Sequence, residues 1–287
     1  MNLFESPSTM SHVLAASADG ETAHVFGDGL VGVISQGASH APRDTAVILF
    51  NAGMVQRSGP HRGSVQLARA LAGKGFPVLR FDQSGLGDSP VSTRPSTDRR
   101  QAELRAAIDL LARETGARRF VVGGICSAAD NAFRVAALEP RVHGLLLLDG
   151  LAYRTAGYWW RYLPPRVFHP GKLWRWWRQR KTQADMANFR DFPTRAEAGA
   201  QMADMVARDV RLLFVFTGGA YRYFNHARQL AACLGKAARS PQVSMAYWRD
   251  CDHTFYRRRD RLRLQALVAS WLEREFAAKP DASAADH

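Results

Sequence analysis

The chain has 287 residues, enough to bury the core of one large α/β domain with an inserted subdomain. No stretch approaches the roughly 20 apolar residues that cross a bilayer. The segment MNLFESPSTM lacks the basic and apolar regions of a secretory signal, so we expect a cytoplasmic protein. The formal charge of +13 favours anionic partners, although no motif for reading nucleic acid accompanies it. Three scattered cysteines argue against a disulfide framework or a zinc site, and we expect neither metal nor cofactor.

Short apolar runs alternate with helical patterns along the chain. Gly75 and Gly116 stand where the first two helices should end. The expected order is a strand at 31–35 that closes an N-terminal hairpin, strand 45–50, helix 64–74, strand 77–82, helix 102–115, strand 119–123, helix 128–138, strand 142–149, strand 211–217, helix 225–234, strand 243–248 and helix 257–276.

Strands that alternate with helices predict a doubly wound, mostly parallel sheet of the α/β class. Residues 1–150 and 211–287 would form this core. The pattern is interrupted at 151–210, where we expect an inserted helical cap. Ligands of such sheets bind beyond the carboxyl ends of the strands, so the reactive residues should directly follow the apolar runs.

The segment VVGGICSA predicts a strand, a sharp turn and a helix, which is the context of a nucleophile at the tip of a turn. Such a tip needs small residues two positions before and after it. Gly124 and Ala128 meet this need for Cys126, whereas a nucleophile at Ser127 would place the β-branched Ile125 at a crowded position. The start of a helix favours the reactive thiolate, so Cys126 is the expected nucleophile.

His253 follows the last predicted strand and is the expected base. Asp149 ends the run LLLLD, where its carboxylate could reach the imidazole, and we prefer it as the acid. Asp252 is the alternative, although its position next to His253 makes the geometry awkward. A Cys–His pair can also work with a weak third member, because a thiol needs less activation than a hydroxyl.

The loop after strand 45–50 should supply part of an oxyanion hole. Gly53 permits an unusual backbone, and the amides of Met54 and Ser127 could together bind the oxyanion. Arg57 and His61 would line the mouth of the site or fix the loop.

Four motifs resemble those of the α/β-hydrolase superfamily: the loop NAGMVQRSGPHR, then RFDQSGLGDS, GGICSAA and DHTF. Within this superfamily the chain is most similar to the hydrolases associated with the exosortase A system, which carry a cysteine nucleophile. The resemblance covers roughly residues 25–150 and 210–275 and implies a Cys126 nucleophile, a His253 base and oxyanion amides at Met54 and Ser127. In many members the acid follows the strand after the cap, but residues 218–223 hold no carboxylate.

The expected cap is rich in tryptophan and arginine, and no acid occurs from Leu151 until Asp185. Trp159 and Trp160 would contact the substrate, while the basic residues would dock an acidic acyl-carrier protein, coenzyme A or a membrane surface. The expected activity is acyl transfer through a Cys126 thioester, as an esterase or thioesterase. The alternatives are an acyltransferase acting on an alcohol or amine, and a non-catalytic binding protein that keeps the fold.

Overall fold

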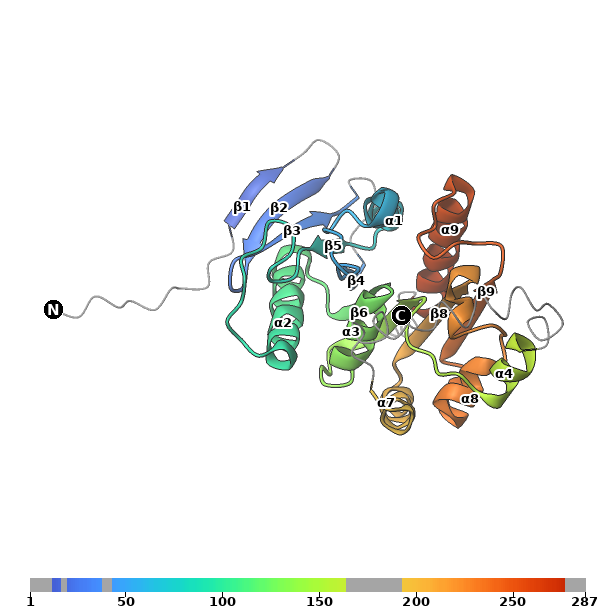
Figure 1. Cartoon of the computed structure of the whole chain (residues 1–287). Coiled ribbons are helices and arrows are strands. Elements are labelled where there is room, and N and C mark those ends of the chain that lie inside the picture. Colours follow the sequence, from blue (N-terminus) through green and yellow to red (C-terminus); the bar gives the residue numbers. More distant parts are fainter. Residues whose placement is uncertain (1–11, 17–19, 38–42, 164–192, 277–287) are drawn as a thin grey trace, which may run out of the picture. The chain divides into compact units, whose positions relative to one another are not determined.

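The computed structural model describes residues 12–16, 20–37, 43–163 and 193–276. The chain divides into two compact units (Figure 1). The first unit holds residues 1–49, 55–121 and 258–287, and the second holds residues 50–54 and 122–257. The division into a core at 1–150 and 211–287 and a cap at 151–210 stays a prediction.

The first unit is built on a sheet with the strand order β1-β2-β3-β5-β4. The first three strands form an antiparallel meander, and β3 pairs antiparallel with β5, whereas β4 and β5 are parallel. Every residue of β4 and β5 is buried, as expected for strands covered on both faces. The bounds are β1 (His12–Ala16), β2 (Glu21–Phe26), β3 (Leu30–Ser35), β4 (Thr45–Leu49) and β5 (Val78–Phe81).

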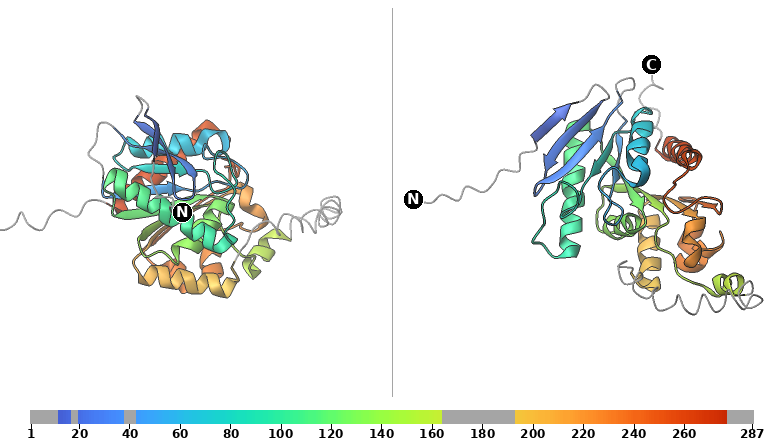
Figure 2. Two further views of the ribbon diagram at one scale, coloured as in Figure 1. Left: turned by 90° about the vertical axis from the view of Figure 1, so that its left-hand side faces the viewer. Right: turned by 45° about the horizontal axis from the view of Figure 1, so that its top comes forward.

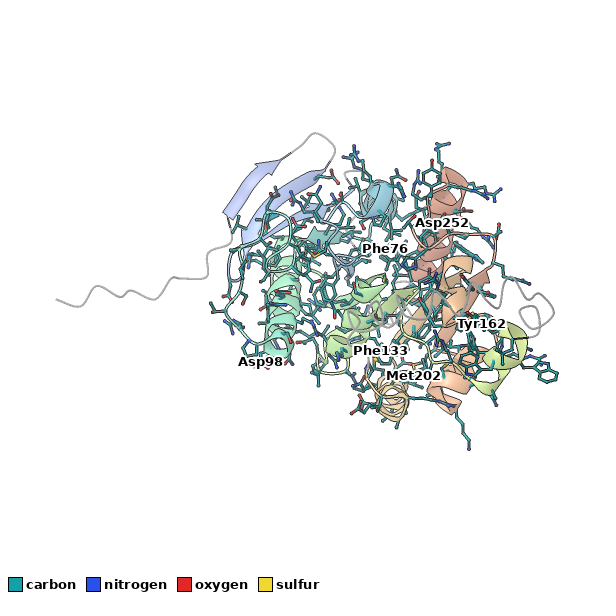
Figure 3. All side chains as sticks on the ribbon, in the orientation of Figure 1. Phe76, Asp98, Phe133, Tyr162, Met202 and Asp252 are labelled. Atoms are coloured by element: carbon teal, nitrogen blue, oxygen red, sulfur yellow. The ribbon has the colours of Figure 1, made fainter. Side chains whose placement is uncertain are left out.

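Two helices cover opposite faces of these strands, and a third packs beside one of them (Figure 2). Helix α1 (Gly63–Ala72) lies against β3 and β5 and against the C-terminal α9 (Arg258–Glu275), while α2 (Ser96–Thr115) lies against β2 and β4. Phe76, which leads from α1 into β5, is fully buried (Figure 3). The core of this unit therefore lies between the sheet and its helices.

The second unit holds strands in the order β6-β7-β8-β9, with β7, β8 and β9 parallel to one another. Strand β6 (Arg119–Ile125) begins in the first unit and ends in the second. The others are β7 (Val142–Leu148), β8 (Arg211–Thr217) and β9 (Val243–Trp248). Parallel strands bring their carboxyl ends to one edge, and the candidate site lies at this edge.

Short helices connect these strands, and several are capped by side chains. Helix α3 (Ser127–Ala136) packs on β7, and α7 (Arg195–Ala207) packs on α8 (Gln229–Leu234). Thr194 and Glu197 form a reciprocal capping box at the start of α7. Phe133 on α3 and Met202 on α7 are among the fully buried side chains (Figure 3). The other elements within the described part of this unit are α4 (Ala156–Tyr162) and the 3-10 helices η2 (Gly218–Arg222) and η3 (Lys236–Arg239).

The sheet and helices predicted from the sequence are confirmed, with differences at the ends of elements. Gly116 caps α2 in the left-handed conformation as expected, but α2 begins at Ser96, six residues before the predicted start. Its first turns are polar and carry no apolar repeat, so periodicity could not locate them. Helix α1 ends at Ala72, and Gly75 lies beyond it with φ 84°.

No helix in the described ranges is long and apolar enough to span a membrane.

Candidate active site

Cys126 stands at the tip of the turn between β6 and α3. Its φ of 59° is in a region that non-glycine residues rarely adopt, and its amide donates to the carbonyl of Leu148 at the end of β7. Such strain costs on the order of 1–3 kcal/mol and persists only where the surroundings impose it. Cys126 is the N-cap residue of α3 and is half-buried.

Small residues make this turn possible. A Cβ atom at Gly124 would lie 2.5 Å from the Cβ of Ala128 and 3.2 Å from the carbonyl oxygen of Phe50. A Cβ atom at Gly123 would lie 2.2 Å from the carbonyl oxygen of Leu146. The crowding around Cys126 is therefore of the kind inferred from the sequence.

Asp149 and His253 are in direct contact. Asp149 follows β7 with φ 46° and is fully buried. The Nδ1 atom of His253 lies 2.8 Å from Oδ2 of Asp149. Because Nδ1 faces a carboxylate acceptor, it carries a proton and leaves Nε2 for a second partner.

That second partner is Cys126. The hydrogen bonds of His253 to Asp149 and to Cys126 raise the pKa of the imidazole to about 10, which outweighs the effect of burial. The imidazole is thus protonated at neutral pH, and an imidazolium beside a thiol at a helix start favours the thiolate. The side chain of His253 is 38% exposed, so the ring can exchange protons with a substrate or solvent.

Asp252, the alternative acid, is engaged elsewhere. Its carboxylate accepts hydrogen bonds from the amides of Thr254 and Tyr256 and from the hydroxyl of Thr254. These bonds fold the turn that presents His253. The carboxylate nearest the imidazole is that of Asp149.

Two residues around Asp149 do not emerge from the sequence analysis. Thr217, the last residue of β8, donates to both carboxylate oxygens: its amide to Oδ1 at 2.6 Å and its hydroxyl to Oδ2 at 2.5 Å. The hydroxyl of Tyr223 donates to the main-chain oxygen of Asp149 at 2.8 Å. Only carboxylates are expected as the acid after β8, and these two residues carry hydroxyl groups instead.

Glycines after β8 allow the His253 loop to approach. A Cβ atom at Gly219 would lie 2.6 Å from the Cβ of His253, and one at Gly218 would lie 2.2 Å from the carbonyl oxygen of Arg249. The pair Gly218-Gly219 directly after a buried apolar run is the sequence signal for this close approach.

The loop expected to complete an oxyanion hole lies against the start of α3. Phe50 donates its amide to the carbonyl of Gly123 at 2.9 Å, and Gly53, with φ 55°, donates its amide to Oγ of Ser127 at 2.9 Å. The amide of Ser127 is at the first position of α3, where amides have no acceptor within the helix. The side chain of Met54 is 88% exposed. The oxyanion role of the Met54 and Ser127 amides stays a prediction.

The remaining predicted site residues fall into two groups. Arg57 belongs to the first unit, where its side chain is paired with Asp82 and Asp88, and it thus fixes its own loop; His61 belongs to the same unit. In the second unit, Trp159 packs edge-on against Tyr158 and Tyr162, whereas Trp160 is 78% exposed. Substrate binding by these residues stays a prediction. Trp174, Trp176 and Trp177 lie outside the described residues.

A family model described as the alpha/beta hydrolase fold matches residues 46–250, most of the chain. The chain belongs to this family. The matched range includes the turn at Cys126, Asp149 and Thr217 and ends shortly before His253. A comparison with curated proteins finds no match.

Solved structures similar to this alpha/beta hydrolase include two esterases and a serine hydrolase. An esterase of Pyrococcus furiosus is 14% identical with a TM-score of 0.60, over 89% of this chain and 87% of its own. A serine hydrolase without a lid from Xanthomonas campestris is 15% identical with a TM-score of 0.53, over 97% of this chain and 100% of its own. The esterase domain of a Rhodothermus marinus protein is 18% identical with a TM-score of 0.51, over 88% of this chain and 97% of its own. At these identities the likeness shows the shared fold.

Proposed function

We propose that this alpha/beta hydrolase is an acyl-transfer enzyme of the esterase or thioesterase type, with Cys126 as its nucleophile. The observation that carries the proposal is the chain of contacts from Cys126 through His253 to the buried Asp149. Its members come from the end of β6, the end of β7 and the loop after β9. A nucleophile, a base and an acid that orients the base are the three parts that acyl transfer requires.

In the first step, the Cys126 sulfur attacks the carbonyl carbon of an ester or thioester. The developing oxyanion is bound by main-chain amides, for which Ser127 and Met54 are the candidates. As the carbonyl re-forms, the protonated His253 gives its proton to the leaving alcohol or thiol. The product of this step is an acyl thioester on Cys126.

In the second step, His253 removes a proton from water as the water attacks the thioester. The tetrahedral intermediate collapses, the bond between the acyl carbon and the Cys126 sulfur breaks, and the carboxylic acid is released. Cys126 leaves as a thiolate beside the imidazolium of His253, which restores the starting pair. Asp149 holds the Nδ1 proton in both steps and keeps Nε2 directed at the reacting atoms.

An acyltransferase is the second candidate, because an alcohol or amine can replace water in the second step. A thioester intermediate favours this outcome, since thioesters react readily with amines. The exposed Trp160 and Arg161 on α4 support a partner that carries the acyl group, and we propose an acidic acyl-carrier protein. Coenzyme A and contact with an anionic membrane are alternatives, and the cytoplasm is the proposed location.

The proposal is tested by trapping the intermediate. The protein is mixed with p-nitrophenyl acetate, quenched in acid and analysed by intact mass and peptide mapping. We expect one acetyl group on Cys126, none in Cys126→Ala, and an unchanged adduct in Cys233→Ser, which alters a buried cysteine away from the turn. Absence of an adduct on wild-type Cys126 would favour a non-catalytic binding protein. Release of the acetyl group to added amines faster than to water would identify an acyltransferase.

A further inference from the structure

Thr217 donates two hydrogen bonds to the carboxylate of Asp149, one from its amide and one from its hydroxyl. It ends β8, the parallel neighbour of β7, and the register that pairs Leu148 with Val215 brings Thr217 beside Asp149. Both Thr217 and Asp149 are fully buried. Two donors of one residue therefore face one carboxylate in a place without competing solvent.

The two hydrogen bonds fix the plane of the carboxylate. The Thr217 amide holds Oδ1 and the Thr217 hydroxyl holds Oδ2, which is also the acceptor for Nδ1 of His253. A carboxylate held at both oxygens cannot rotate about its Cβ–Cγ bond without breaking a buried hydrogen bond. Oδ2 consequently stays directed at the imidazole.

The hydroxyl of Thr217 is itself oriented. It accepts a hydrogen bond from the amide of Gly219 at 3.1 Å. A hydroxyl has one proton to give, and with its lone pair facing Gly219 that proton is directed to Oδ2 of Asp149. Gly219 also lies directly against the backbone of His253, so one short segment sets the positions of acid and base.

We infer that Thr217 is a positioning residue that acts on His253 through the carboxylate of Asp149. This inference rests on the proposed function. Without the Thr217 hydroxyl, Oδ2 loses its fixed direction and the bond to Nδ1 weakens. The imidazole then holds its proton less tightly, and the acid form needed to protonate the leaving group disappears at lower pH.

A purely structural hydroxyl would behave differently. It would satisfy the buried carboxylate, and its removal would lower the melting temperature without altering the pH dependence of turnover. Tyr223→Phe supplies the matched control, because it also removes a hydroxyl that contacts Asp149, but at the main-chain oxygen. We expect Tyr223→Phe to keep the wild-type pH profile.

The experiment measures turnover of ethyl acetate, whose departing alcohol must take up a proton, against pH in the full-length protein. For Thr217→Val we expect kcat to fall about tenfold or more, as for the loss of a hydrogen bond to a charged group. The alkaline limit of kcat should move down by about one pH unit. Thr217→Ser, which keeps the hydroxyl, should recover most of both losses. Thr217→Ala serves as a second hydroxyl-free variant in case valine prevents folding.

A double-mutant cycle with Asp149→Asn decides whether the effect passes through the carboxylate. We expect Thr217→Val to cause little further loss in the Asp149→Asn background, because the group it positions has been changed. Equal losses in both backgrounds, or a wild-type pH profile in Thr217→Val, would overturn the inference. Wild-type protein that forms no Cys126 adduct would instead overturn the proposed function, so the two failures are distinguishable.

Discussion

At the scale of single residues, the candidate site depends on the absence of side-chain atoms next to Cys126. Cys126 can occupy its strained turn because Gly124 presents only a hydrogen toward Ala128 and Phe50. The side chain at position 124 thus controls where the sulfur atom lies. The position of the Cys126 side chain therefore depends on the packing of Gly124 against Ala128 and Phe50.

We predict that Gly124→Ala destabilises the protein by about 1–3 kcal/mol, the usual cost of overpacking a tight contact. The added methyl group would meet the Cβ of Ala128 at 2.5 Å and displace the turn. Chemical denaturation measures the loss, and the extent of Cys126 acetylation shows whether the nucleophile has moved. Gly63→Ala is the control, since a Cβ atom there meets only Arg261 Cδ at 3.9 Å. Equal stability of the two variants would contradict the packing argument.

Some residues of this candidate site could be proposed from the sequence and others could not. Small residues at 124 and 128 distinguish Cys126 from Ser127 because steric limits act over a few positions in the chain. Asp149 and His253 could be proposed because parallel strands bring their ends together. Thr217 could not be, since a threonine that ends a run of leucine, valine and phenylalanine has no local feature that separates a donor to a carboxylate from an ordinary strand residue.

At the scale of elements, the segment after β8 joins the site to α4. Within the second unit, Arg154 and Tyr158 both donate to the carbonyl of Arg222 at the end of η2. Tyr158 stacks on Tyr162, and the guanidinium of Arg154 lies over the ring of Trp159. These contacts bury one face of α4 and leave Trp160 and Arg161 on the other.

We predict that Arg161→Glu weakens binding to a purified acidic acyl-carrier protein at least tenfold at low salt, because a charge reversal replaces attraction by repulsion. Arg239→Glu on η3 makes the same change in net charge at another exposed site and should leave binding unchanged. Isothermal titration calorimetry measures both. Equal weakening in the two variants would point to net charge rather than α4. Retained binding to anionic vesicles without carrier binding would assign the surface to a membrane.

At the scale of the whole molecule, regular elements were predictable and irregular ones were not. The bounds of β8 and β9 agree with the predicted strands because each run ends at a turn, β8 before Gly218-Gly219 and β9 before Arg249-Asp250. The start of α2 was missed because its first residues face solvent and carry no pattern. Helix α8 is shorter than predicted and begins at Gln229. The residues before it form turns in which the amides of Gln229 and Leu230 donate to the carbonyls of His226 and Ala227. Much of the predicted cap, residues 164–192, lies outside the described chain.

Family membership supports the fold of this protein, whereas the proposed reaction rests on local contacts between side chains. Membership in the alpha/beta hydrolase family fixes the sheet and the edge at which ligands bind. It does not fix the reaction, because this fold carries many chemistries. The reaction is inferred from one feature of this chain, which is the protonated imidazole between a thiol and a buried carboxylate.

The most direct test is the rate of Cys126 alkylation by iodoacetamide from about pH 5 to about pH 11, a range that spans the ordinary pKa values of imidazole and thiol. The pKa of His253 is raised from 6.5 to about 10 by its hydrogen bonds to Asp149 and Cys126, so the ring is charged at neutral pH and stabilises the thiolate there. Peptide mass analysis separates Cys126 from the buried Cys233 and Cys251. We predict rapid alkylation of wild-type Cys126 already near neutral pH, and in His253→Ala a rate that rises only near the ordinary thiol pKa of about 8.5. Superimposable curves for the two proteins would contradict the claim that Cys126 and His253 act as a pair.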